Sequence, residues 1–105
     1  MSYLPDIYKV FKQQFPEVAG AYDALAVSCH QWGPLDERTR RLIKVGIAIG
    51  LSSEGAVRSH ARRALQEGIS PDELRHAVLM AFTTAGYPTM MASMKWVDEV
   101  IGKLG

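Results

Sequence analysis

His60 is the residue whose type and surroundings most suggest chemistry. At about 100° per residue, one half of a helical wheel holds His60 together with small or apolar neighbours: Ala56, Val57, Ala61, Ala64 and Leu65. Arg58 and Arg62 fall on the other half and are expected to face water. An imidazole that points inward or into a cleft needs a partner for each ring nitrogen. Its ordinary pKa of about 6.5 lets it hold or give a proton near neutral pH. His60 is therefore the candidate acid–base residue, with a hydrogen-bonded structural histidine as the alternative.

The polar residues around this segment offer His60 possible partners. Glu54 and Glu37 are its nearest acidic candidates by position. Lys44 lies in the apolar run LIKVGIAI, where its ammonium group either extends out to water or holds a carboxylate in a pocket. His76 lies near the polar side of another apolar segment, and His30 lies where a cation suits a helix C-terminus. A structural role is favoured for both of these histidines.

Metal and thiol chemistry have little support in this sequence. The three histidines show no HxxxH or HExxH spacing, and Cys29 is the only cysteine, so we expect no metal site, no cofactor and no intrachain disulfide. Cys29 and His30 are adjacent and point about 100° apart on a helix, which suits a nucleophile and its base poorly. A lone thiol is typical of a reducing cytosol.

Length and composition indicate a single globular domain over residues 1–105. Apolar residues make up 48% and charged residues 22%, and the net charge is +1, so neither nucleic acid nor an anionic membrane is expected as the main partner. The N-terminus lacks a signal-peptide pattern, and no apolar run reaches the length of about 18 residues that indicates a membrane span. We therefore expect a cytoplasmic protein.

Helical periodicity covers almost the whole chain and predicts an all-α bundle. The expected helices are 5–14, 16–32, 37–50, 54–67, 71–85 and 89–103. Asp36 and either Ser52 or Ser53 are predicted N-caps, and Gly68 is predicted to end its helix in the left-handed conformation. The run Ser70-Pro71-Asp72-Glu73 is a predicted capping box.

Two of these helices, 37–50 and 71–85, are apolar on most sides, which is typical of buried, central helices. A chain of this length can hardly cover both of them and the methionine-rich last helix. We therefore predict that part of this surface packs against other copies of the chain.

Taken in order, three motifs resemble those of the carboxymuconolactone decarboxylase family, whose superfamily includes the alkyl hydroperoxide reductase D-like proteins. They are H-x-x-x-A-L-x-x-G at His60, Ala64, Leu65 and Gly68, then S-P-x-E-L at residues 70–74, then G-x-P at residues 86–88. The resemblance covers about residues 35–100. It implies a helical bundle that assembles into rings, commonly trimers or hexamers.

The thiol branch of this superfamily resembles small peroxidases that carry a Cys-x-x-Cys pair and a relay glutamate. Here Ser53 and Ala56 occupy the cysteine positions, and Arg41 occupies the glutamate position. A peroxiredoxin-type activity is therefore not expected, because a hydroxyl and a methyl group cannot form a disulfide. A peroxidase that uses Cys29 between subunits is the least favoured reading.

The other branch resembles the lactone decarboxylase, which removes CO₂ from a carboxylated lactone without a cofactor. Such chemistry needs a cation to seat the carboxylates, for which Arg41, Lys44 and Arg63 are candidates, and a residue to protonate the remaining carbon, for which His60 is the candidate. His76 stands where many members of the family carry a glutamate, which argues against the standard substrate. We therefore expect decarboxylation, or a related proton transfer, on a small organic acid, with a non-catalytic oligomeric helical module as the alternative.

Overall fold

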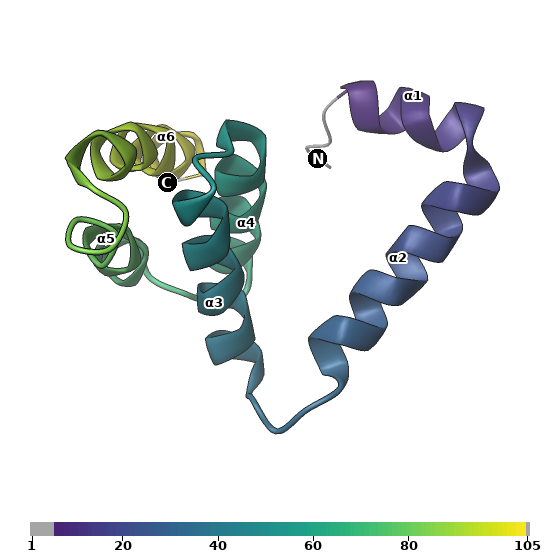
Figure 1. Cartoon of the computed structure of the whole chain (residues 1–105), viewed down its shortest axis with the longest axis horizontal. Coiled ribbons are helices and arrows are strands. Elements are labelled where there is room, and N and C mark those ends of the chain that lie inside the picture. The colour runs from purple at the N-terminus through teal and green to yellow at the C-terminus, as the bar shows by residue number, and fades with distance from the viewer. Residues whose placement is uncertain (1–5, 105) are drawn as a thin grey trace. The chain divides into compact units, whose positions relative to one another are not determined.

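The computed structural model describes residues 6–104, within which every regular element is an α-helix (Figure 1). The predicted all-α fold is confirmed, and the chain separates after residue 34 into two compact units. The described helices are α1 (Asp6–Gln14), α2 (Pro16–Gln31), α3 (Glu37–Gly50), α4 (Glu54–Gln66), α5 (Pro71–Leu79) and α6 (Tyr87–Leu104). None of them has the length and apolar character that a bilayer crossing requires.

The first unit is a pair of helices that meet at Phe15. Pro16 begins α2 as predicted, since a proline in the first turn loses no helical hydrogen bond. The Tyr8 hydroxyl donates to Asp23 Oδ1 at 2.9 Å and ties α1 to α2. The rings of Phe11 and Phe15 pack with their centroids 5.4 Å apart.

The second unit begins with α3, and side chains cap both α3 and α5. Asp36 accepts a hydrogen bond from the Thr39 amide at 2.8 Å, and this bond holds the pKa of Asp36 below its ordinary value. The predicted capping box at α5 is present in full, with Ser70 Oγ accepting from the Glu73 amide and Glu73 Oε1 accepting from the Ser70 amide. The Ser70 amide, followed by the Arg38 guanidinium, lowers the pKa of Glu73 to about 2.

The connection from α3 to α5 follows the predicted pattern with one difference. Ser53, rather than Ser52, is the N-cap of α4, yet its side chain makes no capping hydrogen bond. Gly68 has a φ of +94°, the left-handed conformation predicted for the end of α4.

Helix α5 ends earlier than predicted, at Leu79 rather than near Gly86. The next amides bond three residues back, as in Ala81 to Val78 and Phe82 to Leu79, and residues 80–85 form turns. The Thr84 hydroxyl donates to the Met80 carbonyl at 2.9 Å, a local hydrogen bond that competes with helix continuation. Helix α6 then begins at Tyr87, two residues before the predicted start.

The core of the second unit lies among all four of its helices. It contains these fully buried side chains: Val45, Ile49, Val57, Ala61, Ala64, Leu74, Val78 and Val97. Helix α3 contacts α4, α5 and α6, but each of those helices also contacts the other three, so α3 is no more central than its neighbours. The prediction that one chain cannot cover both α3 and α5 agrees with the burial of the described residues. Four helices cover only part of their surface, and the apolar side chains left exposed include Ile43, Ile47, Leu51, Leu79 and Met80.

Arg58 and Arg62 on α4 correct another prediction, because neither extends freely into water. Arg62 is 8% exposed. Arg58 donates to Glu54 at 3.0 Å and to Glu99, and thereby ties α4 to α6. The wheel placed both residues away from the apolar core but could not show that Glu54 and Glu99 would meet Arg58 there.

The two caps provide a matched test of this local structure. Replacing Ser70 with Ala should lower the free energy of unfolding by about 1 kcal/mol, because the Glu73 amide loses its acceptor. The control is Ser53→Ala, which removes a hydroxyl without a capping bond and should cost less than about 0.5 kcal/mol. Urea unfolding followed by circular dichroism measures both, and equal losses would contradict the assignment.

Candidate functional site

His60, Arg41 and Glu67 form a polar cluster between α3 and α4. Arg41 Nη1 lies 3.0 Å from His60 Nδ1. On its other edge the same guanidinium donates two parallel hydrogen bonds to Glu67, from Nε to Oε1 and from Nη2 to Oε2, each 3.1 Å long. Arg41 therefore connects the imidazole to the carboxylate and joins α3 to the end of α4.

Burial makes this cluster more than a surface ion pair. The Arg41 side chain is 7% exposed and that of Glu67 is 33% exposed, while His60 is partly exposed. A buried guanidinium needs a counter-ion and acceptors for its N–H groups, and Glu67 supplies the charge. Because His60 is partly exposed, its ring is within reach of solvent although Nδ1 faces Arg41.

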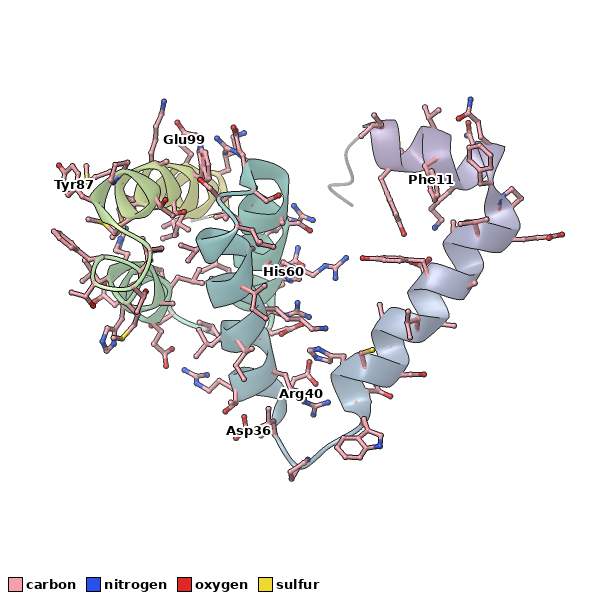
Figure 2. The ribbon with its side chains drawn as sticks, in the orientation of Figure 1. Phe11, Asp36, Arg40, His60, Tyr87 and Glu99 are labelled. Atoms are coloured by element: carbon pink, nitrogen blue, oxygen red, sulfur yellow. The ribbon has the colours of Figure 1, made fainter. Side chains whose placement is uncertain are left out.

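The predicted site residues on α3 and α4 fall along two helix faces. On α4, His60, Arg63 and Glu67 follow at intervals of three and four residues, which places them in one column. On α3, Lys44 follows Arg41 by three residues, is partly buried and lies on the same side of that helix. Glu37, four residues before Arg41, lies on the same side of α3, so the two faces carry carboxylates as well as cations. Figure 2 labels His60 on the flank of α3 and α4 that is turned away from α5.

The hydrogen-bond partner of His60 could not be read from the sequence. Glu54 pairs with Arg58 on an exposed face, and Glu37 lies 3.5 Å from Arg40. Arg41, found at the position of the family's relay glutamate, makes the contact instead. Glu67 was missed, although its place two turns after His60 was a signal that could have found it.

His76 belongs to a different surface from His60. It lines a groove of about 440 Å³ between α3 and α5, whose other lining residues are Thr39, Leu42, Ile43, Gly46, Glu73, Ala77 and Met80. On α3, Thr39 and Arg41 point in nearly opposite directions, since two residues span about 200°. His76 is thus not brought to the cluster that holds His60.

Neither metal ligands nor a thiol pair gathers in the part of the chain that is described. Residues 6–104 contain no group of three or more His, Cys, Asp or Glu side chains with the geometry to hold a metal ion. Cys29 is exposed on α2. Ser53 and Ala56, at the two positions expected for the cysteine pair, lie at the start of α4, where Ser53 is the N-cap.

This fold and cluster define a class of protein: a small all-helical domain whose central histidine is held by a buried arginine and lacks a neighbouring cysteine pair. The chain belongs to the carboxymuconolactone decarboxylase family, whose sequence model matches residues 16–99. This match begins 19 residues earlier than the resemblance in the sequence alone, and includes α2.

The relatives include proteins named as decarboxylases. The chain is 31% identical over 85 residues to the 4-carboxymuconolactone decarboxylase of Acinetobacter baylyi, covering 75% of this chain and 63% of that protein. It is 30% identical over 73 residues to the nitrosuccinic acid decarboxylase of Metarhizium robertsii, covering 66% and 51%. The chain thus spans less than two thirds of either named enzyme. It covers 89% of an uncharacterized protein of Methanocaldococcus jannaschii, with 26% identity over 93 residues and 88% of this chain aligned.

A solved structure has the same fold. The apo form of lpg0406 from Legionella pneumophila, a carboxymuconolactone decarboxylase family protein, aligns with a TM-score of 0.81 at 22% identity, over 92% of this chain and 87% of that one. The predicted family and its helical architecture are therefore confirmed.

The buried guanidinium makes Glu67 important for stability. Replacing Glu67 with Ala should lower the free energy of unfolding by about 1–2 kcal/mol, because Arg41 keeps its buried charge and loses its counter-ion. The matched control is Glu54→Ala, where Arg58 retains Glu99 and the loss should stay below about 0.5 kcal/mol. Denaturant unfolding of the two variants checks this, and a loss no greater for Glu67 than for Glu54 would refute the role assigned to the pair.

Proposed function

We propose that this protein is a cofactor-free decarboxylase of a small organic acid, which binds between α3 and α4 with His60 against the reacting group. The observation that carries the proposal is a partly exposed imidazole fixed by a buried guanidinium and flanked by further cations. Family membership supports the same reaction class.

The charges around His60 suit an anionic substrate. The charge of Arg41 is offset by the bidentate contact with Glu67, so its guanidinium is a poor candidate for a substrate carboxylate. Lys44 on α3 and Arg63 on α4 are the better candidates, since each lies one turn from a member of the cluster. In this proposal they hold the acid, and His60 acts on the charge that develops when CO₂ leaves.

The names of the two decarboxylase relatives support a substrate class. One acts on a carboxylated lactone and the other on nitrosuccinic acid, so each name combines a carboxylic acid with an electron-withdrawing group. Such a group accepts the electron pair that departing CO₂ leaves behind, which is what permits decarboxylation without a cofactor. We extend this class, though neither particular substrate, to the present protein.

The reaction can be tested with a panel of small carboxylic acids that carry a lactone, ketone or nitro group near the carboxylate. Release of CO₂ should be detectable with at least one acid, and His60→Ala should reduce kcat/KM by about 100-fold or more. His76→Ala is the matched control and should retain activity, because His76 lies in the α3–α5 groove. Circular dichroism checks that both variants are folded. Turnover that survives in His60→Ala would eliminate the proposal.

A non-catalytic oligomeric module is the second candidate, and one observation favours assembly. Ile43, Ile47 and Leu51 form a row on α3, spaced four residues apart, and are 44%, 58% and 73% exposed. Rows of large apolar side chains in water usually mark an interface. In this alternative, copies of the chain associate as a trimer or hexamer, and His60 serves only to join α3 to α4 through Arg41.

Assembly can be tested apart from catalysis. Ile47→Glu places a charge in the middle of the exposed row and should shift the molar mass measured by light scattering from that of an oligomer to that of one chain. Gln66→Glu, on the exposed face of α4, is the control and should leave the mass unchanged. A wild-type protein with the mass of one chain would contradict assembly.

A further inference from the structure

In the hydrogen bond between Arg41 and His60, Arg41 can only be the donor. A guanidinium has five N–H donors and no acceptor. Because Arg41 Nη1 lies 3.0 Å from His60 Nδ1, the hydrogen bond exists only when Nδ1 presents its lone pair. In a neutral imidazole with an unprotonated Nδ1, the proton is on Nε2.

We propose that Arg41 is a positioning residue that holds His60 as the neutral Nε2–H tautomer, so that His60 acts in the reaction as a hydrogen-bond donor and not as a base. This inference rests on the proposed function for its chemistry, while the tautomer itself is a property of the resting protein. It also replaces the acid–base role that the sequence predicts for His60.

The alternatives to this tautomer are disfavoured by the same geometry. A base at Nε2 requires the proton on Nδ1, which would aim an N–H group at a guanidinium that cannot accept it. An imidazolium would lose the hydrogen bond and place a second cation against a side chain that is only 7% exposed. A carboxylate at position 41 would have the opposite effect, because it would accept from Nδ1–H and leave Nε2 as the base.

Arg41 cannot readily turn away from His60, because Glu67 fixes it. The two parallel hydrogen bonds from Nε and Nη2 to Glu67 fix the orientation of the guanidinium plane. In this orientation Nη1 faces His60 Nδ1. By helical spacing, the charged groups on the two faces that carry this cluster include Glu37 and Lys44 on α3 and Arg63 on α4.

A neutral donor at Nε2 determines which acids the site can process. The bond between the carboxylate and its carbon breaks, and its electron pair moves through conjugation onto a carbonyl or nitro oxygen while CO₂ leaves. That oxygen becomes an anion and accepts the hydrogen bond from His60 Nε2–H. The electron pair then returns from the oxygen to the carbon, which takes a proton from water. The hydroxide that remains passes to solvent and combines with CO₂ as bicarbonate, so the imidazole stays neutral throughout. The substrate class is therefore carboxylic acids with a conjugated carbonyl or nitro oxygen.

The tautomer can be measured without any substrate. In protein labelled with ¹⁵N-histidine, NMR spectra at pH 7 that correlate ring carbon protons with both ring nitrogens should show His60 with Nδ1 unprotonated and Nε2 protonated. The signals are assigned by their loss in His60→Gln. Arg41→Lys keeps a donor and should keep the pattern, whereas Arg41→Met should shift both nitrogens toward a mixture of tautomers. A protonated Nδ1 in the wild-type protein, or an unchanged spectrum in Arg41→Met, would overturn the proposal.

Turnover gives a second, separate readout. A glutamine at position 60 can accept from Arg41 with its amide oxygen and donate with its nitrogen, which reproduces the Nε2–H tautomer but cannot titrate. His60→Gln should therefore retain kcat within about 10-fold of wild type, while His60→Ala loses about 100-fold or more. Equal losses in both variants would mean acid–base catalysis and would overturn the donor role. A lack of turnover with every acid would count against the proposed function, while the NMR result would still decide the tautomer.

Discussion

Arg41, a buried cation, constrains how α3 and α4 of the second unit pack together. Arg41 lies inside the contact between α3 and α4, and its N–H groups are met by Glu67 on one edge and by His60 on another. Leaving such a group without partners costs several kcal/mol, so the two helices must keep a register that presents both acceptors. The same register brings Ile49 of α3 and Val57 of α4 together in the apolar core.

The same contact explains how a shared family fold can carry different chemistry. In the thiol branch that the sequence resembles, the position of Arg41 is a glutamate and the positions of Ser53 and Ala56 are cysteines. Exchanging an acceptor for a donor beside one imidazole reverses which ring nitrogen carries its proton. The backbone needs no rearrangement, because the difference is confined to side chains on α3 and α4. Fold similarity to the Legionella protein therefore does not specify an activity.

The sequence predicted the elements better than it predicted their contacts. The capping box at Ser70 and the left-handed Gly68 are local signals, so they were confirmed. The end of α5 at Leu79 was missed because residues 80–85 form turns although the sequence there stays largely apolar, and apolar periodicity does not register such turns. Within the site, His60 was identified from its neighbours, and Arg41 from its position in the family pattern. Glu67 was missed because its partner Arg41 lies on another helix, although the place of Glu67 two turns after His60 pointed to it.

The left-handed turn at Gly68 has a consequence for the cluster. Glu67 is the last residue before that turn, and its amide already bonds back to the Arg63 carbonyl at 2.9 Å. An added Cβ at Gly68 would meet no atom within 4 Å, so the demand for glycine there comes from its φ of +94° alone. A residue that favours helical angles at this point would redirect the chain that follows, so that it would no longer turn from α4 toward the capping box of α5 at Ser70. A single glycine thus fixes where the chain turns, one residue after the carboxylate that holds Arg41.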